Sequence, residues 1–483
     1  MKIINVEIND FRCFDTFKIN FSQQYNLHAV IAENMVGKSA LMAAIRLIAN
    51  TYTSGLKQER QIQINDHRII GNNPIADISP DVEIITTAII TDSQNRKNES
   101  SWKKFKTKPK GESTKVEIIS GSDPRKECKI INKLVSEGKA IQPLFSFIGT
   151  EYIHVESSDT VDWEVNGKSI DGYKGCFEDK SIKKFLFKWL AKIDSIINEM
   201  NRKSIIAETY KDLPENAMFL FKTAVKSILP DIIEIEWSND AEQPIVKLEN
   251  GEIRAFNMLS DGYRYLILLA GELATRAFIL NKHLGKEVLQ KIHGLVIIDE
   301  FGIHLHPALQ NDALIRLQKT FPNIQFIIST HSPLLLNGLK KEQVHILSIN
   351  TDGKRVETNP EEDIIGLGAN QILTKIFGLP TTMDNQFLQW NEEYTTLFKK
   401  KTEQGLSSKE IVQFEDLSKK LSHLRLDPAL EITTEDPITI LVKEKMANRS
   451  LEKTISDSVQ FSPENLEKEV GDILNNLFTK VSE

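Results

Sequence analysis

A short loop between Ala32 and Ser39 combines a glycine, a lysine and a hydroxyl group at a spacing that suits phosphate binding. Its sequence, AENMVGKS, nearly matches the pattern GxxxxGK[ST], with Ala32 in place of the first glycine. In such a loop Gly37 lets the backbone approach the phosphates, Lys38 reaches the β and γ phosphates, and the Ser39 hydroxyl ligates Mg²⁺. An apolar run precedes the loop, and the helix-forming run SALMAAIRLIAN follows it. The loop predicts that the chain binds ATP with Mg²⁺, and Asn34 is expected among the nucleotide contacts.

Two carboxylates and a histidine follow two further apolar runs. Asp299 and Glu300 come directly after the strand predicted at residues 295–298. Asp299 is placed to hold the Mg²⁺ shell, and Glu300 is placed to act as general base on the attacking water. His331 follows the apolar run at residues 326–329, where it could sense the γ-phosphate. The structural alternatives are a strand that happens to end in an acidic turn and a histidine that only stabilises the fold.

The segment LSDGYR, residues 259–264, places a Leu-Ser-x-Gly turn at the start of a predicted helix. The order of all these motifs resembles the soluble branch of the ABC-type ATPases, which includes RecF, SMC and OLD-type proteins. The resemblance covers roughly residues 1–50 and 250–340. It implies an α/β fold, namely an ABC-type P-loop ATPase head with a mixed sheet and flanking helices, followed by a C-terminal α-helical region.

The same resemblance implies several residue roles. Ser260 and Gly262 would bind the γ-phosphate of a nucleotide held by the opposite subunit, so the protein would act in head-to-tail pairs. Arg12, which follows Phe11 after the first predicted strand, would lie near the nucleotide. The glutamine that such ATPases use near the metal is not identified, and Gln61 and Gln63 are the candidates. Asp261 and Tyr263 stand where transporter ATPases usually have Gly and Gln, which disfavours a transporter.

Outside the ATPase motifs the chain resembles PtuA, the ATPase subunit of Septu antiphage systems and of some retron-linked systems. The similar features are a short helical insertion, the stretch 364–373 and a helical hairpin that carries Trp390 and Tyr394. The resemblance implies a separate HNH nuclease that the ATPase controls. An OLD-type nuclease domain would need an Asp-x-Asp after His331, and residues 340–483 contain none.

The chain divides into two predicted domains. Residues 1–375 form the ATPase domain, interrupted by the helical insertion at about 175–230, and residues 376–483 form a helical C-terminal domain suited to partner docking. Amphipathic stripes predict helices on both sides of Gly405, with Ser407 and Glu410 as a capping box. A third helix is predicted to start at Ser462-Pro463.

Composition indicates a soluble intracellular protein. The net charge is −7, and there are only three cysteines, far apart in the sequence, which favours a reducing cytoplasm over a disulfide framework. No apolar run is long enough to span a membrane, and the N-terminus does not resemble a signal peptide. His304 and His306 have no third histidine or cysteine nearby, so an interface turn is favoured over a zinc site.

One basic stretch is the candidate for a nucleic-acid contact. Residues 92–115 hold eight lysines and arginines, of which Lys103, Lys104 and Lys106 lie beside Trp102 and Phe105. A solvated surface hairpin loop is the simpler interpretation of the same stretch.

Three functional hypotheses follow. The leading one is an ATP-binding and ATP-hydrolysing regulatory subunit of an antiphage complex, in which nucleotide-dependent pairing controls a partner HNH nuclease. The second is a RecF-like DNA repair ATPase that clamps DNA directly through the basic loop at residues 96–115. The third is an ATP-stabilised assembly scaffold with little turnover, which the missing first glycine at Ala32 leaves open. The assembly is expected to be a dimer or a larger homo-oligomer built from pairs.

Overall fold

The computed structural model of the protein describes residues 1–56, 60–71, 77–92, 94, 96–109, 112–150, 152, 163–164, 167–179, 182–203 and 208–425. The chain separates into two compact units, Met1–Pro380 and Thr381–Glu483. The boundary lies five residues after the position expected from the sequence.

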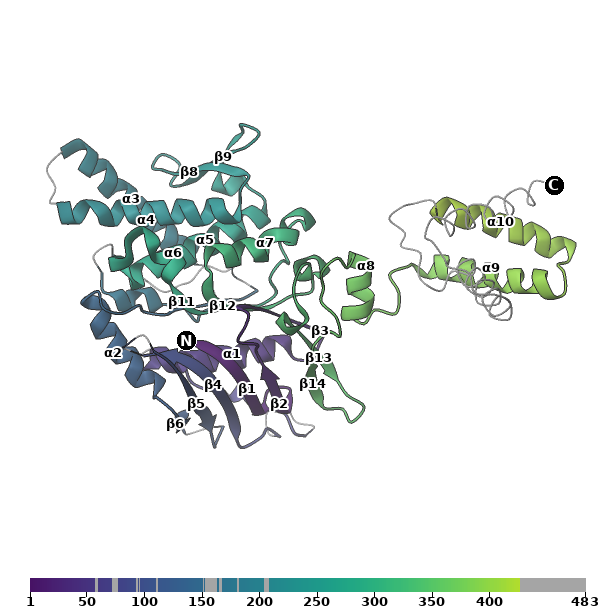
Figure 1. Ribbon diagram of the computed structural model, residues 1–483, viewed down its shortest axis with the longest axis horizontal. Helices are drawn as coiled ribbons and strands as arrows, with labels where there is room; N and C mark the ends of the chain where they lie inside the picture. The colour runs from purple at the N-terminus through teal and green to yellow at the C-terminus, as the bar shows by residue number, and fades with distance from the viewer. Residues whose placement is uncertain are drawn as a thin grey trace, which may run out of the picture. The chain divides into compact units, whose positions relative to one another are not determined.

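The first unit contains an antiparallel sheet near the N-terminus (Figure 1). Its strand order is β2-β1-β4-β5-β6, with bounds β1 Lys2–Phe11, β2 Phe14–Asn20, β4 Val82–Thr91, β5 Lys97–Lys106 and β6 Lys115–Ser120. Buried and partly exposed residues alternate strictly along β4. This alternation is typical of an antiparallel sheet with one face on the core and the other toward solvent.

A second sheet of six strands forms the centre of the first unit. Its order is β14-β13-β3-β12-β11-β7, with bounds β3 Leu27–Ala32, β7 Leu144–Ile148, β11 His293–Ile298, β12 Asn323–Ser329, β13 Val344–Ile349 and β14 Arg355–Thr358. All these strands are parallel except β14, which pairs antiparallel with β13. Every residue of β3 is buried, as expected for a parallel strand covered on both faces. The carboxyl ends of β3, β7, β11 and β12 therefore share one edge of the sheet, where polar residues can meet.

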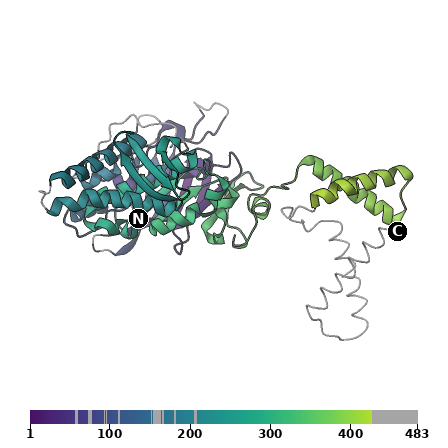
Figure 2. The ribbon, with the colours of Figure 1, turned by 90° about the horizontal axis from the view of Figure 1, so that it is seen from above.

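Helices cover both faces of the six-stranded sheet. Helix α1, Lys38–Ser54, contacts strands of both sheets and lies between them (Figure 1). On the other side lie α3 Lys183–Lys203, α4 Glu208–Ile228, α5 Asp261–Leu280 and α7 Pro307–Thr320. Helices α3 and α4 lie side by side, as both views show (Figures 1 and 2). The remaining helices of the first unit are α2 Pro124–Ser136, α6 Val288–Lys291 and α8 Ala369–Gln371.

A small antiparallel sheet precedes α5. Its strands are β8 Ile232–Ser238, β9 Gln243–Leu248 and β10 Ile253–Ala255. The chain passes from β10 through a short turn of 3₁₀ helix directly into Leu259 and Ser260. This small sheet therefore fixes the point at which the helix α5 begins.

The fold class expected from the sequence is confirmed: a mixed sheet with flanking helices forms an α/β unit, and a helical region follows. One local expectation is wrong. The basic stretch at residues 92–115 is not mainly a loop, because Lys97–Lys106 forms β5, which pairs with β4 and β6. Every second residue from Ser100 to Lys104 is buried in this strand: Ser100, Trp102 and Lys104. Because two of these three buried residues are polar, the sequence does not show the apolar-polar alternation that indicates a strand. No helix among the described residues is both long and apolar enough to cross a membrane.

The described part of the second unit consists of two consecutive helices that contact each other, α9 Asn385–Glu403 and α10 Ser408–Arg425. Tyr394, Leu397, Leu417 and Leu421 form its small core, and the Tyr394 and Phe414 rings stack with centroids 4.9 Å apart. The Glu410 carboxylate accepts hydrogen bonds from the backbone N–H and the hydroxyl of Ser407, which confirms the expected contact at the start of α10. The sequence predicts an apolar stripe of Ile411, Phe414, Leu417, Leu421 and Leu424 on this helix. Ile411 does not join the stripe, because it is 44% exposed.

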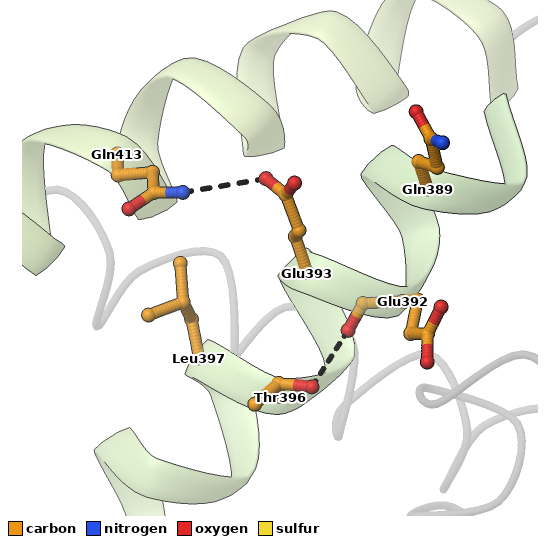
Figure 3. Close-up of a pocket in the computed structure, with 6 residues that line it drawn as sticks. All are labelled: Gln389, Glu392, Glu393, Thr396, Leu397 and Gln413. Atoms are coloured by element: carbon orange, nitrogen blue, oxygen red, sulfur yellow. Dashed lines mark hydrogen bonds between the residues drawn. The ribbon is translucent and has the colours of Figure 1, made fainter. Parts of the chain in front are cut away.

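A shallow depression lies on the helical hairpin (Figure 3). It is lined by Gln389, Glu392, Glu393, Thr396, Leu397 and Gln413. The Gln413 amide donates to the Glu393 carboxylate at 3.3 Å across the two helices. The third helix expected from Ser462 lies outside the described residues.

Candidate active site at the edge of the parallel sheet

The phosphate loop joins β3 to α1 at the carboxyl edge of the six-stranded sheet. The Lys38 ammonium donates a hydrogen bond to the backbone carbonyl oxygen of Ala32 at 2.6 Å, so the side chain folds back over its own loop. Burial lowers the pKa of Lys38, while the nearby carboxylates of Glu300 and Asp299 act in the opposite direction. Ser39 and Asn34 are exposed at this edge. The loop therefore presents a cation, a hydroxyl and the N-terminus of a 17-residue helix to one space.

Gly37 is required by the geometry of this loop. Its φ angle is +125°, in the region that favours glycine, and a Cβ atom built there would lie 2.7 Å from Cys13 Sγ and 2.9 Å from Phe14 Cζ. Arg355 on β14 supports the same loop, because its Nε donates to the carbonyl oxygen of Val36 at 2.8 Å. The sequence alone did not indicate Arg355, since it lies far along the chain with no motif around it.

Asp299 and Glu300 stand where β11 ends, beside the end of β12. Strand pairing aligns Ile298 with Ile328, so Asp299 lies next to Ser329. The Ser329 hydroxyl donates to Asp299 Oδ1 at 2.5 Å and accepts the backbone N–H of Glu300 at 2.7 Å. Glu300 adopts a φ of +55°, a conformation that non-glycine residues rarely take. Such strained residues cluster at functional sites.

His331 lies at the same edge, two residues beyond β12. Partial burial lowers its pKa, the Lys38 charge adds to this effect, and the carboxylates of Glu300 and Asp299 oppose it. The parallel pairing of β12 with β3 and β11 places His331 at the edge of the sheet that also carries the phosphate loop and both carboxylates. The structure thus brings together Lys38, Asp299, Glu300 and His331, which come from three separate parts of the sequence.

The Leu-Ser-x-Gly turn forms the N-terminus of α5. Ser260 is the N-cap residue, but its exposed side chain makes no capping hydrogen bond, so the first N–H groups of the 20-residue helix stay available. Gly262 is buried against the turn after Glu300: a Cβ atom built there would lie 2.9 Å from the His304 carbonyl oxygen. Among the described hydrogen bonds and ion pairs, none joins Ser260 or Gly262 to Lys38 or Ser39 of the same chain. Within the described residues, the turn is therefore not hydrogen-bonded to the phosphate loop of its own chain.

A buried polar network anchors α5 to the central sheet. Arg276 Nε donates to Glu272 Oε1 at 2.7 Å, and both side chains are almost fully buried. The Ser146 hydroxyl on β7 donates to the same carboxylate at 2.9 Å, and the Tyr152 hydroxyl donates to its other oxygen at 2.6 Å. Because every carboxylate oxygen has a donor, the charge is tolerated inside the protein, and the helix is tied to β7.

Arg12 and the two candidate glutamines lie in local contacts. The Arg12 guanidinium pairs with Asp66 Oδ1 at 2.9 Å and is partly exposed. Gln61 Oε1 accepts the backbone N–H of Thr114 at 2.7 Å, and the Gln63 amide donates to the Gln61 carbonyl oxygen. No described hydrogen bond joins either glutamine to Lys38, Asp299 or Glu300, so neither is brought into the candidate site.

The basic stretch does not offer the three lysines that a DNA clamp would need. Lys104 is fully buried, Lys103 pairs with the carboxylates of Glu83 and Glu117 at 3.1 and 3.3 Å, and Lys106 donates to the Ile62 carbonyl oxygen. These contacts favour a structural role for the centre of β5. If the protein binds DNA directly through this stretch, the contact must come from its outer lysines.

The oxygen donors at the site fit Mg²⁺. The Ser39 hydroxyl and the Asp299 carboxylate are hard oxygen ligands, and Mg²⁺ in nucleotide sites is held by one or two such groups together with the phosphates. Within the part of the chain that the structure describes, no group of three or more His, Cys, Asp and Glu side chains could hold a metal by itself. His306 instead accepts the Ala308 N–H at the start of α7.

Comparison with known proteins gives a consistent family. Residues 5–250 match the family described as "AAA domain", and residues 179–337 match the family described as "AAA domain, putative AbiEii toxin, Type IV TA system". The chain is 26% identical to "Retron Vc95 probable ATPase" of Vibrio cholerae serotype O1 biovar El Tor, covering 85% of this chain and 86% of that protein. It is 23% identical to "Retron Ec83 probable ATPase" of Escherichia coli, over 72% of this chain and 71% of that protein. It is also 30% identical to "Septu protein PtuA" of Bacillus mycoides (strain KBAB4), over 40% of this chain and 26% of that protein.

Proposed function

The chain belongs to the AAA domain family, and on that basis we propose that it is an ATP-hydrolysing regulatory subunit of an antiphage defence complex. The observation that carries the proposal is the meeting of Lys38, Asp299, Glu300 and His331 at one edge of the parallel sheet. The relatives named as retron ATPases and as Septu PtuA supply the defence context.

The side chains at this edge divide the work of ATP hydrolysis. Lys38 leaves the Ala32 carbonyl when triphosphate enters and neutralises the β and γ phosphates. Glu300 orients the attacking water and accepts its proton, and His331 donates a hydrogen bond toward the γ-phosphate. The Ser39 hydroxyl and the Asp299 carboxylate would hold Mg²⁺, which would supply positive charge to the phosphate oxygens. Asn34 and Arg12 complete the nucleotide contacts.

The exposed turn at Ser260 supports action in pairs. In the proposed assembly, Ser260 and the first N–H groups of α5 of one subunit contact the γ-phosphate bound by its partner. Large apolar side chains are exposed around the same elements: Met35 in the phosphate loop (93%), Met258 before Ser260 (71%) and Ile303 after Glu300 (64%). Contact between two subunits would remove these side chains from water.

The ATPase is proposed to control the activity of a separate HNH-type nuclease. The helical hairpin α9–α10 is the proposed docking region, in line with the PtuA resemblance. Val412 and Ile411 on α10 are 66% and 44% exposed, which suits a helical surface that binds another protein.

A complementation experiment tests the shared site directly. Lys38→Ala removes the phosphate loop cation, and Ser260→Arg blocks the turn that reaches the partner. Each variant alone should have no intact site, whereas a mixed pair contains one intact site made of the Lys38 of one subunit and the Ser260 of the other. An equal mixture should recover about a quarter of wild-type ATP hydrolysis, because half of the pairs are mixed and each has one of two sites.

The controls separate the parts of this proposal. Ser260→Arg should still bind ATP as a monomer, whereas Lys38→Ala should not. Absence of any recovery in a mixture whose mixed pairs are shown to form would contradict the shared site. Purification of the protein with its operon neighbour, followed by identification of the co-eluting protein, tests the nuclease partner.

A further inference from the structure

Ser329 occupies the last position of β12 and contacts both residues that the proposed reaction requires at the end of β11. Its hydroxyl carries one proton and accepts through its lone pairs. The proton goes to Asp299 Oδ1 at 2.5 Å, and a lone pair accepts the Glu300 N–H at 2.7 Å. Ser329 is fully buried, so no water can replace either bond without rearrangement.

The first bond fixes the orientation of the Asp299 carboxylate. Because Oδ1 accepts the Ser329 proton, Oδ2 is the oxygen left for a metal ion or for a water in its shell. Without the hydroxyl, the Asp299 side chain could rotate about its last bond, which has a broad torsional preference.

The second bond holds the backbone of Glu300 in its unfavourable conformation. A φ of +55° is rarely adopted by a residue with a Cβ atom, and it persists only when the surroundings impose it. Two further contacts from the end of β12 act on the same turn: the Phe301 N–H donates to the Ser329 carbonyl oxygen, and the Thr330 hydroxyl donates to the Phe301 carbonyl oxygen. Gly302 packs on Leu335 of the 3₁₀ turn that follows. Of these contacts from β12 and the turn after it, the Ser329 hydroxyl is the one that bonds to Glu300 itself.

We propose that Ser329 is a positioning residue for ATP hydrolysis, which aligns the Asp299 carboxylate and holds Glu300 in the conformation from which it acts on water. This inference rests on the proposed function. Ser329 is not itself a ligand or a base, since both of its hydrogen-bonding directions are used within the protein.

The test compares Ser329→Ala and Ser329→Thr with a matched control, Ser146→Ala. Ser146 is also a fully buried serine of the same sheet, and its hydroxyl also donates to a buried carboxylate, that of Glu272. The control therefore loses the same kind of bond on β7, and β12 and β11 lie between that strand and β3, which leads into the phosphate loop. Two quantities are measured for each protein: the kcat and KM for ATP, and the Mg²⁺ concentration that half-saturates ATP binding by an equilibrium method.

Ser329→Ala should lower kcat about 10- to 100-fold, the range expected for a lost hydrogen bond to a charged group, with KM changed less than about twofold. It should also raise the half-saturating Mg²⁺ concentration several-fold, because the carboxylate is no longer aligned. Ser329→Thr keeps the hydroxyl and should restore most of both quantities. Ser146→Ala should change neither.

An unchanged kcat, an unchanged Mg²⁺ requirement in Ser329→Ala, or an equal loss in Ser146→Ala would overturn the inference. If wild-type protein binds ATP but shows no turnover, the proposed function fails, and the Mg²⁺ requirement for ATP binding alone then decides the role of Ser329. If Ser329→Ala does not fold, Ser329→Cys takes its place under the same criteria, since a thiol is a much weaker donor.

Discussion

The Lys38 ammonium lies 2.6 Å from the carbonyl oxygen of Ala32, the residue that replaces the first glycine of the phosphate-loop pattern. Ala32 is the last residue of β3 and is not among the residues with positive φ. The position therefore contributes a backbone oxygen rather than glycine's conformational freedom. This geometry explains why an alanine is compatible with the loop.

The replacement of Ala32 by glycine should leave ATP affinity nearly unchanged. Ala32→Gly keeps the carbonyl oxygen that Lys38 contacts, and affinity measured by equilibrium titration should stay within about threefold of wild type. The free energy of unfolding should fall by about 1 kcal/mol, because a buried methyl group is lost and because glycine is less favourable than alanine in a strand. A gain in affinity of tenfold or more would show that the missing glycine weakens the loop.

Substitution of Gly37 should destroy the phosphate loop. Gly37→Ala introduces a Cβ atom 2.7 Å from Cys13 Sγ at a φ of +125°, so the loop backbone must move and ATP binding should be lost. The matched control is Gly251→Ala: Gly251 also has a positive φ, +85°, but a Cβ atom there meets nothing within 4 Å.

The control should bind ATP like wild type and lose about 1 kcal/mol of unfolding free energy from backbone strain. Equilibrium titration with ATP and urea denaturation of both variants measure these effects. Wild-type ATP affinity in Gly37→Ala would contradict the assignment of the loop.

Removal of the carboxylate at Glu300 should stop hydrolysis without preventing binding. Glu300→Gln keeps the size of the side chain but cannot accept the proton, and kcat should fall about 100- to 10,000-fold, the usual contribution of a general base. ATP-dependent pairing, measured by light scattering, should become more persistent because the nucleotide is not consumed. Glu234→Gln, at an exposed position of β8, is the control and should hydrolyse ATP normally. Normal turnover in Glu300→Gln would assign the base elsewhere.

Acid should destabilise the first unit through buried His28. Burial lowers the pKa of His28 to about 3, and the charges of His345 and Lys2 add to the effect. Since the unfolded side chain titrates near pH 6.5, the unfolded state binds more protons below that value. The stabilisation by neutral His28 is therefore complete above pH 6.5 and is lost as the pH falls toward 3.

Between pH 7.5 and 5.5 this loss should amount to about 1.4 kcal/mol of unfolding free energy. Urea denaturation of wild type and of His28→Gln at both pH values measures the contribution of His28 together with its contact to His345 Nε2 at 3.2 Å. The variant should show a smaller pH dependence by that amount. Identical pH dependence in the two proteins would exclude His28 as the cause.

Charge reversal at the buried lysine of β5 should lower the free energy of unfolding rather than affect a DNA contact. Lys104 is fully buried, so Lys104→Glu should lower the free energy of unfolding by about 3 kcal/mol or more. Lys97→Glu, at an exposed position of the same strand, should change it by less than about 0.5 kcal/mol. If Lys104→Glu instead retains wild-type stability and loses DNA binding, the direct-clamp hypothesis regains support.

Much of the ATPase head could be predicted from the sequence because its signals are local. The strand-loop-helix around Lys38, the apolar strand before Asp299 and the helix after Ser260 each combine a short motif with a clear hydrophobic period. The order of these motifs also predicted the family that the comparison then showed. Local chemistry and periodicity are sufficient for elements of this kind.

Only the tertiary structure decided which of these residues meet and what holds them. Ser329 lies beside Asp299 because β11 and β12 pair in parallel with Ile298 opposite Ile328, a register that no local pattern encodes. Arg355 reaches Val36 only because β14 joins the sheet edge next to the phosphate loop, and Lys104 turns inward because β5 becomes the fourth strand of a sheet rather than a loop. Sequence by itself determined the reactive groups and the elements that carry them. Strand order and register, which depend on packing between distant segments, determined how those groups are positioned.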